Sequence, residues 1–91
     1  MLIRSQNKEL LVNFNVSAGI EIEELNTKTV VTSYITGCSY LLGEYSTKAK
    51  AMKVLDMIQE AYERYEYEKV FKTGLTLFET FQMPEDSEVE A

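Results

Sequence analysis

The chain has 91 residues, 45% of them hydrophobic and 26% charged, and its fifteen acidic and nine basic side chains give a net charge of −6. This composition is typical of one small globular domain and not of a disordered chain. The chain contains no histidine and a single cysteine, Cys38. An internal disulfide, the usual cysteine and histidine zinc sites, and histidine-dependent nucleophilic catalysis are therefore excluded. We expect no catalytic residue, no metal and no cofactor, and hence no enzyme.

The acidic side chains are concentrated near the end of the chain. Four lie within residues 85–91, whereas residues 1–84 carry eleven acids and nine bases. Duplex nucleic acid is bound through clustered Lys and Arg, so we expect no such partner. No apolar run has the length of a signal peptide or a membrane span, and we expect no membrane partner. The sequence predicts a cytoplasmic protein with a single domain over 1–84 and an acidic tail over 85–91.

Five short segments in the first half of the chain are predicted as strands. Alternation of isoleucine and glutamate at 20–23 is typical of a half-buried strand, and the β-branched and aromatic residues of 29–36 suit a sheet better than a helix. The connections are short, which favours an antiparallel meander of neighbouring strands. The five segments are residues 1–6, 10–14, 20–23, 29–36 and 40–45.

From Ser46 the hydrophobic period changes from 2 to 3.6, which predicts one long amphipathic helix with Ser46 or Thr47 as its N-cap. Residues 76–83 form either a last strand or an extended arm that ends at Pro84. The predicted core stripe of the helix is Ala51, Val54, Leu55, Ile58, Tyr62 and Tyr65.

These elements predict an α+β fold: an antiparallel β-meander of five or six strands with one long amphipathic helix packed on one face. A single helix covers one side of such a sheet. The other side would then carry exposed aromatic residues, and we expect it to form a homo-oligomer interface or to exchange the C-terminal arm. The aromatic residues in question are Phe14, Tyr34, Tyr40, Tyr45, Phe78 and Phe81.

Lys48, Lys50 and Lys53 lie at the start of the predicted helix, where the helix dipole disfavours cations. Free N–H groups and three ammonium groups together can bind a phosphate, and Arg4 on the first strand is a further candidate phosphate ligand. Other interpretations stay open for both sets of residues. The lysines either give solubility or pair with the acidic tail of the same or a neighbouring subunit. Arg4 pairs with an internal glutamate.

Seven segments of the chain can be compared with a known family: residues 1–6, 11–13, 42–47, 50–51, 54–55, 58–59 and 81–84. Through these segments the chain resembles a family of small uncharacterised proteins of phages and prophages of Gram-positive bacteria. The resemblance spans most of the chain and implies a viral accessory protein in the bacterial host cytoplasm; it implies no catalytic or binding residue.

Two functions follow as hypotheses. The first is a non-enzymatic counter-defence protein that sequesters a small nucleotide signal, with Arg4, Lys48, Lys50 and Lys53 on the phosphates. The alternative is an inhibitor or adaptor that binds a host protein through the open sheet face or the acidic tail.

Overall fold

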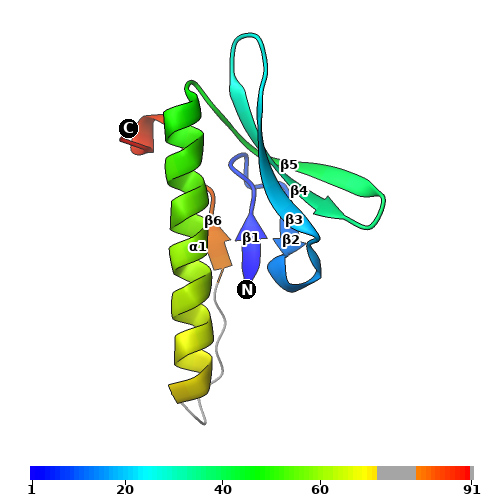
Figure 1. The fold of residues 1–91 in the computed structure, drawn as a ribbon, viewed down its shortest axis with the longest axis vertical. Coiled ribbons are helices and arrows are strands. Elements are labelled where there is room, and N and C mark those ends of the chain that lie inside the picture. The colour runs from blue at the N-terminus through cyan, green and yellow to red at the C-terminus, as the bar shows by residue number, and fades with distance from the viewer. Residues whose placement is uncertain (72–79, 91) are drawn as a thin grey trace.

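The computed structural model describes residues 1–71 and 80–90, which form an α+β fold (Figure 1). The α+β class is therefore confirmed. Within the described residues there are six strands, one long helix and two short 3-10 turns. The elements are β1 (Leu2–Arg4), β2 (Leu11–Asn13), η1 (Phe14–Val16), β3 (Gly19–Glu24), β4 (Thr29–Ile35), β5 (Cys38–Tyr45), α1 (Lys48–Phe71), β6 (Thr80–Gln82) and η2 (Asp86–Glu88).

The strands form two sheets of three and not the single meander predicted from the sequence. In the order β3-β4-β5, all pairs are antiparallel, as expected for a meander. In the order β2-β1-β6, the first hairpin pairs with the end of the chain, and β6 runs parallel to β1. A parallel pair needs a long crossover, and here β2, the meander and α1 all lie between β1 and β6 along the chain. Residues 76–79 of the predicted last segment lie outside the described residues.

A bulge in β5 brings the two sheets together. Thr32 pairs with Leu41 and the residue before it pairs with Gly43, so Leu42 is an extra residue on β5. An inserted residue disrupts the local ladder and bends its strand. The carbonyl oxygen of Leu42 accepts a hydrogen bond from the backbone N–H of Gln6, in the hairpin between β1 and β2, at 2.7 Å. The bulge therefore connects the meander to the first hairpin.

The helix α1 begins as predicted. The Oγ1 atom of Thr47 accepts a hydrogen bond from the backbone N–H of Lys50 at 3.2 Å, which is the N-cap geometry. Most of the predicted stripe faces the core: Ala51, Val54 and Ile58 are buried, Tyr62 and Tyr65 are half-buried and pack against the core, and Leu55 is half-buried. The helix contacts all three strands of the β3-β4-β5 sheet.

Residues 85–90 pack on the domain and are not a free tail. Val89 is only 4% exposed and belongs to the hydrophobic core, beside Met83 at the end of β6. The segment between them forms η2. Burying a valine side chain is worth roughly 1.5–3 kcal/mol, so the C-terminal segment contributes to the fold.

The aromatic residues expected on an open face divide into two groups. Tyr45 is buried, which corrects that expectation, and Phe14 and Phe81 are half-buried against the core. Tyr34 and Tyr40 are exposed on the β4–β5 hairpin, which projects away from α1 in Figure 1. Phe78 lies outside the described residues. The radius of gyration is 13.6 Å, above the roughly 12 Å expected for a compact chain of this length.

Candidate functional site

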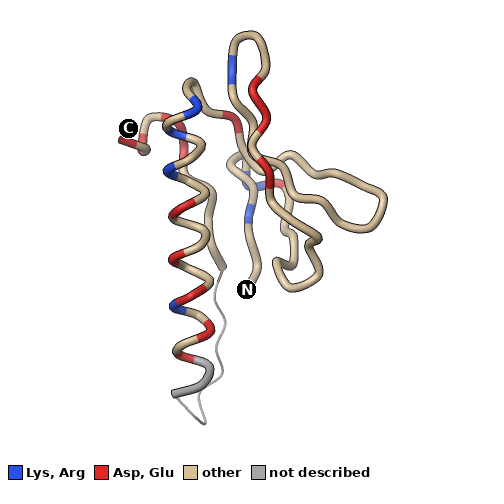
Figure 2. Tube along the Cα trace, in the orientation of Figure 1, with Lys and Arg blue, Asp and Glu red and all other residues tan. Residues whose placement is uncertain are grey.

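The three lysines predicted as a phosphate site do lie together in the first turns of α1, where Figure 2 shows the blue segments of the helix. Their side chains are engaged unequally. The Nζ atom of Lys48 lies 3.3 Å from the carboxylate of Glu24 on β3, in an exposed ion pair. Lys53 is exposed. Lys50 is half-buried and binds the C-terminal segment.

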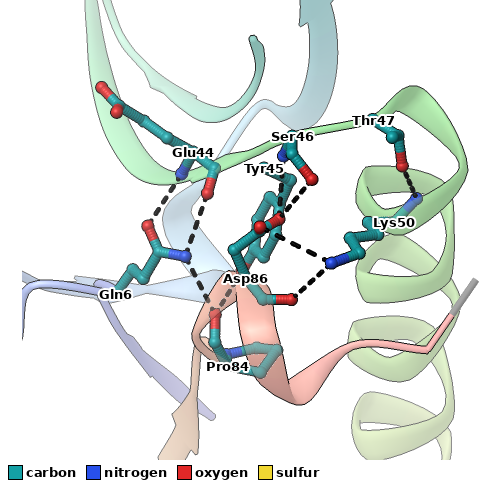
Figure 3. A network of polar contacts seen from close by, with 8 residues as sticks. All are labelled: Gln6, Glu44, Tyr45, Ser46, Thr47, Lys50, Pro84 and Asp86. Carbon is teal, nitrogen blue, oxygen red and sulfur yellow. Dashed lines mark hydrogen bonds and ion pairs between the residues drawn. The ribbon is translucent and has the colours of Figure 1, made fainter.

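Asp86 of η2 supplies a carboxylate at the entry to α1 (Figure 3). Its Oδ1 atom accepts hydrogen bonds from the backbone N–H of Ser46 at 2.8 Å and from the hydroxyl of Ser46 at 3.1 Å. The ammonium of Lys50 lies 2.9 Å from the backbone carbonyl oxygen of Asp86 and 3.5 Å from its Oδ2 atom. The backbone hydrogen bond from Ser46, more than the charge of Lys50, lowers the pKa of Asp86. One alternative left open in the sequence was that the lysines pair with the acidic tail of the same chain. This alternative is confirmed for Lys50.

Gln6 connects three distant parts of the chain at the same place (Figure 3). Its amide oxygen accepts a hydrogen bond from the backbone N–H of Glu44 at 2.9 Å, and its amide nitrogen donates to the Glu44 carbonyl oxygen at 3.0 Å. The same nitrogen donates to the carbonyl oxygen of Pro84 at 3.1 Å. A side-chain amide therefore continues the strand pairing of β5.

Tyr45 completes this network from the core side. Its ring lies against Gly43, where an added Cβ would be only 3.1 Å from the ring. Its hydroxyl donates to the carbonyl oxygen of Pro84 at 2.8 Å. Burial, followed by the nearby carboxylates within residues 85–88, raises the pKa of Tyr45 far above its ordinary range. The phenol therefore stays protonated and acts as a donor.

We call this network the junction: it consists of Gln6, Glu44, Tyr45, Ser46, Lys50, Pro84 and Asp86. Throughout the described part of the chain, every buried side-chain nitrogen and oxygen has a hydrogen-bond partner. A catalytic or ligand-binding group would be expected to keep some hydrogen-bonding capacity for its ligand. The junction therefore fits a structural role.

Arg4 is engaged within the first hairpin. Its Nε atom donates to the backbone carbonyl oxygen of Lys8 at 3.0 Å, within the turn of the first hairpin. Within residues 1–71 and 80–90, no ion pair joins Arg4 to a glutamate, the alternative considered for it in the sequence. Arg4, Lys48 and Lys50 therefore contact three different parts of the fold, which are the first hairpin, β3 and the C-terminal segment.

A groove of about 470 Å³ lies between the middle of α1 and the segment from η1 to the start of β3. Its walls are mainly apolar, with polar groups from Ser17, Gln59 and Glu63. The rings of Phe14 and Tyr62 face each other with their centroids 4.6 Å apart and tilted by 36°. The apolar and aromatic lining residues are Phe14, Ile20, Leu55, Ile58 and Tyr62.

The sequence did not predict this groove. Leu55, Ile58 and Tyr62 were assigned to the core stripe, and Leu55 and Tyr62 are in fact half-buried beside the opening. The only signal was the predicted surplus of aromatic residues, which included Phe14. The groove depends on how α1 lies against β3, and local periodicity carries no information on that.

Two kinds of site are absent from the described residues. Between residues 1 and 71 and between 80 and 90, no three histidine, cysteine, aspartate or glutamate side chains are placed to hold a metal ion. No helix in these ranges is both long and apolar enough to cross a membrane.

Comparison of the chain with protein-family models, with curated proteins and with solved structures finds no match.

Proposed function

We propose that the chain is a non-enzymatic binding protein that holds an apolar segment of another protein in the groove between α1 and β3. The apolar groove of about 470 Å³ carries this proposal. Ligand sites are typically concave, mostly apolar and provided with a few polar groups. Here the polar groups are Ser17, Gln59 and Glu63.

The groove replaces the two surfaces considered in the sequence for a host-protein partner. The C-terminal acidic segment is held at the junction by Ser46 and Lys50, and Val89 is buried, so the segment is fixed to the domain and cannot wrap around a partner as a free arm.

Tyr34 and Tyr40 are about one third exposed, but they lie on opposite faces of the β4–β5 hairpin, because Tyr40 pairs with Ser33 and Tyr34 pairs with Ser39. They therefore form no single aromatic face, and we keep a homo-oligomer as part of the proposal with either tyrosine at the contact.

Sequestration of a nucleotide signal has less support. Lys48 and Lys50 are neutralised by Glu24 and Asp86, and the groove carries Glu63, whose charge opposes a phosphate. Under our proposal, a panel of cyclic nucleotides and nucleoside diphosphates leaves the melting temperature unchanged. A nucleotide-dependent rise that disappears in Lys53→Glu would favour sequestration instead.

The phage context also remains a proposal. Three segments that carry the resemblance, residues 1–6, 42–47 and 81–84, meet at the junction. Two further segments that carry it, residues 54–55 and 58–59, contain Leu55, Ile58 and Gln59 of the groove, so the resemblance covers both the junction and the groove. In this context the partner is a protein of the bacterial host, in the host cytoplasm.

A peptide-library selection on the full chain tests the proposed function. Selected peptides are then titrated against the wild type, Leu55→Gln in the groove and Met52→Gln as a matched control. Met52 is 45% exposed on α1 and does not line the groove. We expect Leu55→Gln to weaken binding about tenfold, as loss of an apolar contact predicts, and Met52→Gln to bind like the wild type. Equal binding by both variants would overturn the proposal.

A further inference from the structure

We propose that the partner segment is extended, alternates apolar and basic residues, and adds to the sheet as a fourth strand along the free edge of β3. This inference rests on the proposed function, because the same segment places its apolar side chains in the groove. Peptides commonly bind by strand addition, where main-chain hydrogen bonds supply affinity and alternate side-chain pockets supply specificity.

The first observation is the position of β3 at an edge. In the order β3-β4-β5, the strand pairs with β4 along its whole length, from Gly19 to Glu24, and with no other strand of the described residues. An edge strand presents a row of unpaired N–H and C=O groups. At six residues, β3 is twice as long as β2 and β6, the edge strands of the other sheet.

The hydrogen bonds between β3 and β4 show which backbone groups of β3 point away from β4, toward the free edge. Leu25 donates its N–H to the carbonyl oxygen of Lys28 at the turn, and the carbonyl oxygen of Glu21 accepts from a side chain of β4. Alternate residues of an antiparallel strand bond to the same neighbour. The backbone groups of Glu21 therefore face β4, and those of Ile20 and Ile22 face the free edge.

The side chains of β3 then define the partner. Ile20 and Ile22 are half-buried and pack against the core, and Ile20 also lines the groove. Glu21 and Glu23 are exposed on the opposite face. Side chains on neighbouring strands pair on the same face. An added strand therefore places one set of side chains beside the isoleucines, in the groove, and the alternate set beside the two glutamates.

Charge complementarity selects basic residues for the second set and argues against a second copy of this chain. In an antiparallel pair of two β3 strands, Glu21 and Glu23 of one copy lie near those of the other, and like charges opposite one another are destabilising. An acidic or purely apolar strand leaves the two carboxylates unpaired. The chemistry that fits is a lysine- or arginine-containing strand with every second residue apolar.

Calorimetric titration of the full chain with three eight-residue peptides tests this inference. The first alternates valine and lysine, the second has four valines followed by four lysines, and the third alternates valine and glutamate. We expect the alternating valine–lysine peptide to bind roughly tenfold more tightly than the block peptide of equal charge. The valine–glutamate peptide should bind more weakly than both.

Two further experiments distinguish strand addition from non-specific electrostatic attraction of a basic peptide to a chain whose net charge is −6. The variant Glu21→Lys with Glu23→Lys should come to prefer the valine–glutamate peptide, whereas Glu60→Lys with Glu90→Lys, of equal charge change at other exposed positions, should keep the wild-type preference. Methylating the backbone nitrogens of alternate residues in the valine–lysine peptide should abolish binding for one set and spare the other, because only one set faces β3.

The inference is overturned if both methylated peptides bind alike, or if the two lysine variants show the same preference. The proposed function has a separate test. If peptides selected from the library lose affinity in Leu55→Gln but are insensitive to backbone methylation, the groove binds apolar segments without strand addition. If Leu55→Gln has no effect on any peptide, the proposed function itself fails.

Discussion

The junction and the groove lie against the same helix and differ in what their side chains contact. At the junction, groups from three distant parts of the chain bond to one another, as Gln6 does to Glu44 and Pro84. At the groove, apolar side chains surround an open space of about 470 Å³. Gln6, Lys50 and Asp86 are thus used to hold the fold, and the groove left for a partner is lined mainly by apolar side chains.

The largest effect is expected from removing residues 85–91. The deletion removes the buried Val89 and the anchor that Asp86 provides at the start of α1. Loss of the valine burial alone should lower the free energy of unfolding by about 2 kcal/mol, as measured by urea denaturation. Deletion of residues 90–91 alone keeps both contacts and should have little effect. If both deletions are equally stable, the junction does not depend on the C-terminal segment.

A matched pair of glutamine variants compares the two regions directly. Gln6→Ala removes three hydrogen bonds at the junction and should cost about 2 kcal/mol of unfolding free energy. Gln59→Ala removes one exposed side-chain contact at the groove, and alanine is the better helix former. Its unfolding free energy should stay within about 0.5 kcal/mol of the wild type. If chemical denaturation showed equal losses of unfolding free energy for Gln6→Ala and Gln59→Ala, the junction and the groove would not differ in their contribution to stability.

Two tyrosines allow a finer comparison. Tyr45→Phe removes the hydroxyl that donates to the carbonyl oxygen of Pro84 inside the fold, and should lower the unfolding free energy by about 1 kcal/mol. Tyr62→Phe removes a hydroxyl at the groove, where a hydrogen bond to the carboxylate of Glu66 raises the pKa of the phenol. We expect no measurable change in its thermal unfolding. A larger shift for Tyr62→Phe than for Tyr45→Phe would reverse the assignment of roles.

The smallest effect is a pH dependence at the entry to α1. The folded state lowers the pKa of Asp86. The ionised carboxylate therefore stabilises the fold fully above the ordinary aspartate pKa of about 4, and this stabilisation is lost as the pH falls through the lowered pKa. The urea midpoint of the wild type should therefore exceed that of Asp86→Asn at pH 7, and the difference should shrink between about pH 4 and pH 2.

Asp56→Asn, the same substitution on the exposed surface of α1, serves as the control. Its urea midpoint should follow that of the wild type over the same pH range. A difference between wild type and Asp86→Asn that stays constant from pH 7 to pH 2 would show that the ionised carboxylate of Asp86 does not stabilise the fold.

Local features were predictable from the sequence. The start of α1 at Thr47 and its buried stripe follow from a cap residue and a 3.6-residue period. The strands β3 to β5 follow from alternation and β-branched residues. The three lysines were correctly placed on the helix, and the acidic tail was among the alternatives considered for their partner. The structure selects that alternative for Lys50, which binds Asp86, 36 residues away, whereas the pairing of Lys48 with Glu24 was not anticipated.

What the sequence determined by itself was the α+β class, the single long helix, the strands of the meander and the exclusion of histidine and disulfide chemistry. These depend on composition and on residues within about one helical turn of each other. The tertiary structure decided the rest: the pairing of β6 with β1, the junction and the groove. Contacts such as Gln6 with Pro84 join residues 78 positions apart. The pairing of β6 with β1 brings these residues together, and local propensity does not act over that separation.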